Sequence, residues 1–198
     1  MKLFRRNLNM IISTLCTLLI FQNNLWAKPL EVPYVAQFNK YSCGAAALEM
    51  VYKYYQRSDI SQQEIFKKHH EADPEYKSET RISTLSLISD AKSRGFEAFW
   101  RRVNYKNKSQ SLAVLKSYLR DKTPVIVCLQ FSKEMPRVGH FRVVIDIDER
   151  DNIYFYDPYK SGLMKWPADQ FMDYWQPTGK DVTGGVYVII RKYAGMPR

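Results

Sequence analysis

Residues 37–55 read QFNKYSCGAAALEMVYKYY. Ser42 is a good helix N-cap, so this stretch predicts a helix from Cys43 to about Arg57. Its apolar side is formed at helical spacing by Ala46, Ala47, Met50, Val51 and Tyr54. The first turn of a helix has free N–H groups and carries the positive end of the helix dipole. These groups favour the thiolate and can lower a cysteine pKa from about 8.5 into the range of roughly 3.5–7.5. We therefore predict that Cys43 is a reactive nucleophile, with Gly44 leaving the backbone open beside its sulfur.

The remainder of the chain predicts mainly helices in its first half and mainly strands of an antiparallel sheet in its second half. A capping-box pattern, SQQE, opens a short helix at Ser61, a third helix ends at Gly95, and a fourth covers residues 110–121. Strands are expected at residues 96–103, 125–131, 139–147, 153–157, 162–166 and 185–191, with a short helix from Pro167 to Trp175. Helices first and strands afterwards indicate an α+β fold, with one domain at residues 28–198.

Only three histidines are available to serve as a base for the cysteine. His69 and His70 are adjacent in a charged segment, where we expect surface residues and at most a weak metal site. His140 follows Gly139 at the start of an apolar strand, so a rigid edge can project its side chain into a cleft. A lone histidine is often a structural residue, but His140 is the plausible partner of a cysteine at a helix start.

A histidine base is usually oriented by a third group. Asp157 ends the strand that pairs with the His140 strand, and Pro158 favours an extended conformation there. Asp146 is the competing candidate, but it lies six residues along the His140 strand, about 20 Å away at ~3.3 Å per residue.

Gln37 precedes the cysteine by six residues, and its amide can donate to an oxyanion together with the Cys43 N–H. We expect Cys43, His140 and Asp157 to be catalytic and Gln37 to form the oxyanion hole.

These residues resemble the bacteriocin-processing cysteine peptidases, which cleave double-glycine leaders and belong to the papain-like clan. The matching segments are VPYVAQ (32–37), YSCGAAALEMV (41–51), GHFRVV (139–144) and YFYDP (154–158). The resemblance implies a papain-like fold, those four roles, a peptide or protein substrate, and no metal or cofactor. The best-known members are N-terminal domains of ATP-driven exporters, whereas this chain is similar to a free-standing exported member. Its specificity for double-glycine leaders is therefore not carried over.

The first 27 residues have the three-part layout of a secretory signal peptide. Lys2, Arg5 and Arg6 precede a 12-residue apolar run from Met10 to Phe21, and small Ala27 offers a cleavage site. The run is shorter than the ~20 residues that span a bilayer. We expect an exported protein, periplasmic or secreted; an uncleaved membrane anchor is the alternative.

The formal net charge is +10, and the signal contains three basic and no acidic residues. The basic residues of the mature part are scattered, and no nucleic-acid motif accompanies them. We expect a solvated cationic surface and no nucleic-acid partner, although the charge also allows peripheral attraction to an anionic envelope surface. No motif determines the oligomeric state.

Cys128 lies in the apolar strand PVIVCLQF (124–131). It is expected to be a buried apolar filler, although an exported protein could also join it to Cys43 in a disulfide. The leading hypothesis for the whole chain is hydrolysis of peptide bonds through a thioester on Cys43. Two alternatives remain open: an acyltransferase of transglutaminase type or a cell-wall amidase that uses the same three residues, and a peptide-binding module without catalysis.

Overall fold

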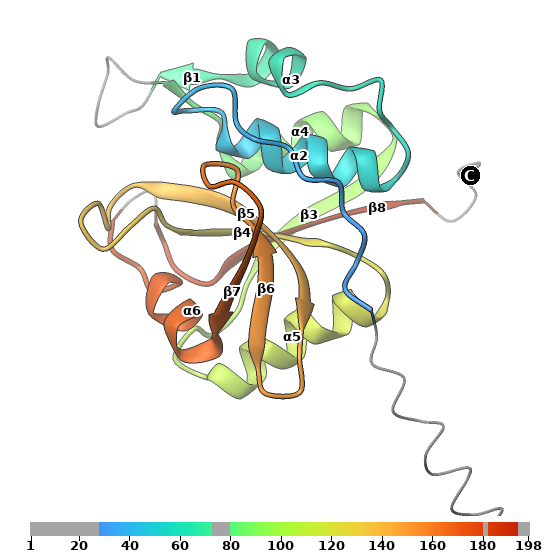
Figure 1. The fold of residues 1–198 in the computed structure, drawn as a ribbon. Coiled ribbons are helices and arrows are strands. Elements are labelled where there is room, and N and C mark those ends of the chain that lie inside the picture. The colour runs from blue at the N-terminus through green and yellow to red at the C-terminus, as the bar shows by residue number, and fades with distance from the viewer. Residues whose placement is uncertain (1–27, 73–79, 180–181, 194–198) are drawn as a thin grey trace, which may run out of the picture.

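A six-stranded antiparallel sheet forms the centre of the molecule, with the strand order β3–β8–β4–β5–β6–β7 (Figure 1). The computed structural model describes residues 28–72, 80–179 and 182–193, so the predicted signal peptide (1–27) lies outside the described residues. The strands are β3 (Phe96–Arg102), β4 (Val125–Gln130), β5 (Gly139–Ile147), β6 (Asn152–Tyr156), β7 (Leu163–Pro167) and β8 (Val186–Lys192). All six were predicted to within a few residues.

Helices lie on both sides of this sheet. Figure 1 shows α2 (Cys43–Tyr54), α3 (Gln62–His69) and α4 (Thr84–Ser93) grouped on one side, with α5 (Lys108–Arg120) and α6 (Ala168–Tyr174) on the other. The predicted α+β layout, in which N-terminal helices pack on a C-terminal antiparallel sheet, is confirmed. A short ribbon of β1 (Glu71–Ala72) and β2 (Thr80–Arg81) was not predicted, because two-residue strands have no periodicity to detect.

Local capping signals set most of the helix ends. The hydroxyl oxygen of Ser61 accepts a hydrogen bond from the Glu64 N–H at 3.3 Å, as the capping-box pattern predicted. Gly95 follows α4 with φ 85°, the left-handed conformation that glycine adopts at low cost. Helix α2 ends at Tyr54 instead of about Arg57, because Gln56 takes a left-handed conformation with φ 64°.

The start of α2 is held by a turn that the sequence did not predict. Ser42 is its N-cap residue, but its side chain accepts no hydrogen bond from the helix. Instead, the Ser42 hydroxyl oxygen accepts from the Asn39 N–H at 3.2 Å, and the hydroxyl donates to the Asn39 carbonyl at 3.1 Å. The N–H groups of the first turn are therefore not occupied by the Ser42 side chain.

Small residues let α2 approach the sheet closely. Ala45, Ala46 and Ala47 are fully buried in the core. A Cβ added at Gly44 would lie 3.1 Å from Cδ2 of Phe141 on β5, tighter than ordinary van der Waals contact. The first turn of α2 therefore lies against the start of β5. Among the described residues, no helix is both long and apolar enough to cross a membrane.

We expect replacement of Gly185 by alanine to lower the free energy of unfolding by about 2 kcal/mol. Gly185 has φ 66°, and an added Cβ would lie 2.4 Å from the Val103 carbonyl oxygen. The Gly162→Ala variant is the control, because Gly162 also has a positive φ (93°) but has no atom within 4 Å of its added Cβ. Urea unfolding of both variants measures the difference. A loss for Gly185→Ala no larger than that for Gly162→Ala would contradict the steric argument.

Candidate active site

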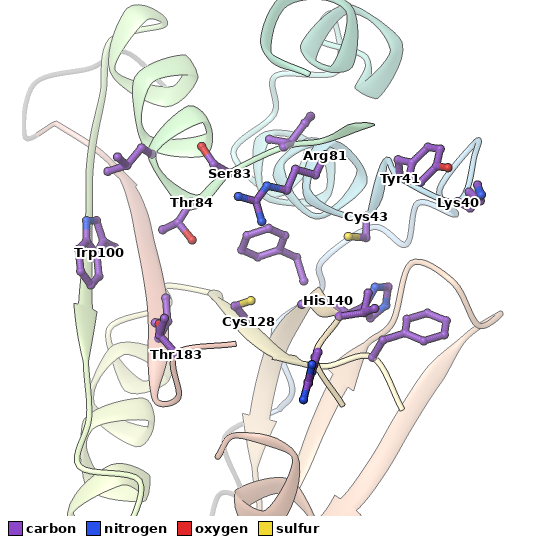
Figure 2. A pocket seen from close by; sticks show the side chains of 18 of the residues that line it. Lys40, Tyr41, Cys43, Arg81, Ser83, Thr84, Trp100, Cys128, His140 and Thr183 are labelled. Carbon is purple, nitrogen blue, oxygen red and sulfur yellow. The ribbon is translucent and has the colours of Figure 1, made fainter. Parts of the chain in front are cut away.

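Cys43 is the first residue of α2 and faces the start of β5 (Figure 2). Burial by itself would raise the pKa of its thiol. The charge of His140 and a hydrogen bond with its side chain act in the opposite direction, as do hydrogen bonds from the backbone of Phe141 and Gly44. The net effect lowers the pKa of Cys43, which favours the thiolate.

His140 is buried at the second position of β5, with 2% of its surface exposed. Its Nε2 lies 2.6 Å from Oδ1 of Asp157, which leaves Nδ1 as the ring nitrogen available to the Cys43 sulfur. Burial would lower the pKa of His140, but the Cys43 charge and the hydrogen bonds with Asp157 and Cys43 raise it. The two pKa shifts share one cause, since the imidazolium and the thiolate stabilise each other.

Asp157 is placed by the hairpin of β5 and β6. Val143 pairs with Tyr156, so the residue after β6 falls beside the first part of β5, as the sequence predicted. The Asp157 carboxylate accepts hydrogen bonds from His140, from Arg142 and from the N–H of Tyr159. Burial would raise the pKa of this carboxyl, but the His140 hydrogen bond and the charges of His140 and Arg142 hold it well below its usual range. Asp157 is therefore ionised and fixed.

Arg142 is a member of this site that sequence reasoning missed. Its side chain is buried, and its Nε donates to Oδ2 of Asp157 at 2.8 Å. Its other two nitrogens donate to the carbonyls of Gln130 and Phe131, both at 3.1 Å. One signal was present in the sequence: an arginine inside an apolar strand, two residues after His140, lies on the same face of the strand and needs a buried partner.

Gln37 is hydrogen-bonded both to the loop before α2 and to the residue that follows Asp157. Its N–H donates to the Pro158 carbonyl at 2.9 Å, and its side-chain amide donates to the Asn39 carbonyl at 2.7 Å. Its Oε1 is a buried oxygen with no hydrogen-bond partner among the described residues. The predicted role of Gln37 in the oxyanion hole remains a prediction.

The other sequence candidates lie elsewhere. His69 was expected on the surface, which is wrong: its side chain is 13% exposed, and its Nε2 lies 2.9 Å from the buried carboxylate of Asp90. His70 is exposed and stacks on Phe66. Asp146 lies near the far end of β5, away from His140 as the sequence predicted, and burial raises the pKa of its carboxyl. Among the described residues, no three acidic, histidine or cysteine side chains are grouped to hold a metal ion.

A cavity of about 450 Å³ opens beside Cys43 and His140. Figure 2 shows Cys43 and His140 on one side of it and Trp100 and Thr183 on the opposite side, with the Arg81 side chain between. Cys128 is buried, as predicted, and also lines this cavity. Cys43 and Cys128 are both free thiols, with no disulfide between them. The thiol at the helix start is therefore open to a ligand that enters the cavity.

Comparison with known proteins is consistent with this geometry. The sequence model described as the Peptidase_C39 like family matches residues 29–183. No curated protein sequence matches the chain. A double glycine motif protease from an AMS/PCAT transporter, solved in complex with the leader peptide, is 21% identical with a TM-score of 0.58, over 84% of this chain and 96% of that one. The peptidase domain of Streptococcus ComA, a bi-functional ABC transporter in a quorum sensing pathway, is 20% identical with a TM-score of 0.61, over 82% and 100%. At these identities the two structures show that the folds agree.

Proposed function

Because the chain belongs to the Peptidase_C39 like family, we propose that it is a cysteine peptidase that hydrolyses peptide bonds through a thioester on Cys43. The observation that carries the proposal is the buried chain of contacts from the Cys43 sulfur through His140 to Asp157. The lowered pKa of the thiol and the raised pKa of the imidazole are the shifts that an attacking thiolate and a proton donor need.

The proposed reaction has two halves. The Cys43 thiolate attacks the carbonyl carbon, and we propose that the Cys43 N–H and the side-chain amide of Gln37 stabilise the negative charge on the carbonyl oxygen. His140 gives its proton to the leaving amine as the C–N bond breaks, which leaves a thioester. Neutral His140 then takes a proton from water, the hydroxide attacks the thioester, and the acid product leaves as the thiolate forms again. Asp157 holds the Nε2–H of His140 throughout.

A peptide is the proposed substrate. The transporter protease in the comparison was solved with the leader peptide, and the cavity of this chain gives a peptide access to Cys43.

We also propose that the chain is exported after removal of residues 1–27 and acts as one domain. Both statements follow from the sequence pattern alone.

Labelling by iodoacetamide tests the proposed nucleophile. We expect Cys43 to be alkylated rapidly well below pH 8, because its pKa is lowered. In His140→Ala, burial is no longer opposed by the imidazolium, so the labelling curve should move to higher pH. Rates measured across pH 4–9, with the labelled residue located by mass spectrometry, give the comparison.

The Cys43→Ser variant is the control, because it retains Cys128, which lines the same cavity. Its labelling reports any reaction of Cys128. Labelling of wild-type Cys43 no faster than that of a free thiol at each pH would contradict the proposed nucleophile.

A further inference from the structure

The cavity beside Cys43 is lined by four basic residues and, among the described residues, by no acidic one. The basic residues are Lys40, Arg81, Arg102 and Arg137. The charge of the chain as a whole is more balanced, with 30 lysines and arginines against 20 acidic residues. A concave site with a single sign of charge attracts ligands of the opposite sign.

Arg102 supplies positive charge on the side of the cavity away from the thiol. It ends β3, where it pairs with Val186 of β8, and both residues line the cavity. Its guanidinium carbon lies 5.8 Å from the ring centroid of Trp100, a third lining residue. Within the described part of the chain, Arg102 forms no ion pair, so its charge is available to a ligand.

Arg137 supplies positive charge on the side of the catalytic histidine. It precedes His140 by three residues in the loop before β5, and its stem packs beside Gly179, where an added Cβ would lie 3.5 Å from the Arg137 Cγ. It too forms no ion pair with any described residue. A ligand that extends from Cys43 into the cavity therefore meets a cation at either side.

The remaining wall is largely apolar. Besides Trp100, the lining includes the exposed residues Leu85 and Val138 and the buried side chains of Ile82 and Phe141. An arginine can donate two parallel hydrogen bonds to a carboxylate, and the apolar wall can pack against the methylene stem of an acidic side chain.

We propose that this cavity selects peptides that carry an aspartate or glutamate beside the bond that is cleaved, with Arg102 and Arg137 as the residues that determine this preference. The inference rests on the proposed function, since it names the substrate class of the same site. Partly exposed ion pairs contribute about 0.2–1 kcal/mol, so each arginine should favour an acidic side chain over its neutral amide by about 1.4- to fivefold.

Matched alkylating probes test the preference. The probes are iodoacetyl-Glu-amide with iodoacetyl-Gln-amide, and iodoacetyl-Leu-Glu-amide with iodoacetyl-Leu-Gln-amide. With every probe the Cys43 sulfur displaces iodide. The two members of a pair differ only in the side chain that enters the cavity. We expect the Glu member of at least one pair to react several-fold faster with the wild-type protein. The rate ratio should fall about 1.4- to fivefold in Arg102→Gln and in Arg137→Gln, and it should also fall in high salt, which screens the charge.

The control is Arg101→Gln. Arg101 is the neighbour of Arg102 on β3, is exposed and does not line the cavity, so this variant makes the same change in net charge outside the site. Equal rates within both pairs, or the same fall in ratio for Arg101→Gln, would overturn the proposal.

Two further readings separate this inference from the proposed function. Iodoacetamide alone reports whether Cys43 is activated, and an unreactive thiol would count against the peptidase proposal only. Fluorescent versions of the same dipeptides, bound to the Cys43→Ala variant and followed by anisotropy, need no reactive thiol. Tighter binding of the Glu peptide, weakened by Arg102→Gln and Arg137→Gln, supports the preference; equal affinities for the Glu and Gln peptides overturn it.

Discussion

Asp157→Asn is expected to lower peptide turnover by about 10²- to 10⁴-fold and to move the alkylation of Cys43 to higher pH. An asparagine has one acceptor oxygen, whereas the two oxygens of Asp157 accept from donors on both sides. With the oxygen toward His140, the NH₂ group faces the Arg142 N–H; with the amide reversed, it faces the Tyr159 N–H. The first orientation keeps the His140 contact but sets a donor against Arg142, and the second sets a donor against both His140 and Tyr159. In both, the carboxylate charge is lost, so His140 is held less firmly.

The direction of the pH shift follows from the coupling within the site. The hydrogen bond to Asp157 raises the pKa of His140, and the charge of His140 lowers the pKa of Cys43. Weakening the first interaction leaves less imidazolium at neutral pH, so the thiolate forms at higher pH. Rates of labelling across pH 4–9, together with turnover of a peptide that the wild type cleaves, measure both effects.

Asp146→Asn is the matched control, because Asp146 lies at the other end of β5. It should leave both the labelling curve and turnover unchanged. If Asp157→Asn retained its fold by circular dichroism and also retained the wild-type labelling curve, Asp157 would not be the group that orients His140.

Arg142→Met is expected to lower the free energy of unfolding by about 3–5 kcal/mol. Arg142 is 2% exposed, donates to the Asp157 carboxylate, and also donates to the carbonyls of Gln130 and Phe131. Methionine fills much of the same volume but removes the donor to Oδ2 of Asp157 and the donors to the two carbonyls. The loss is measured by urea denaturation at pH 7.

An exposed arginine–carboxylate pair provides the control for this variant. Arg191 donates to both oxygens of Glu97 at 2.8 and 3.0 Å, but its side chain is 43% exposed. Arg191→Met should therefore cost less than about 1 kcal/mol, because water solvates the carboxylate that is left. Equal losses for the two variants would show that burial of Arg142 is not the source of its effect.

Acid should weaken the same contact in the wild-type protein. The pKa of Asp157 is held far below its value in an unfolded chain, about 3.9. The stability from this shift is complete above that value and is lost as the pH falls below it. The difference in stability between wild type and Arg142→Met should therefore narrow below about pH 4, as urea denaturation at several pH values would show.

Much of the fold could be predicted because its signals are local. Caps at Ser61 and Gly95, apolar spacing in the helices and the apolar runs of β4, β5 and β8 all lie within short windows. The proximity of His140 and Asp157 was also predictable, since a short turn joins the two strands of their hairpin. By contrast, the pairing of β3 with β8 joins segments about 90 residues apart, and no local pattern specifies it.

By itself, the sequence determined that a cysteine starts a helix, that a histidine starts an apolar strand and that an aspartate faces that histidine across a hairpin. Only the tertiary structure decided that the cysteine meets the histidine and the aspartate. Gly44 and the small residues after it let α2 lie against Phe141, which brings the Cys43 thiol to His140. Packing also buried Arg142 against Asp157 and set Arg102 on the far wall of the cavity, because long-range strand order decides which side chains surround a site.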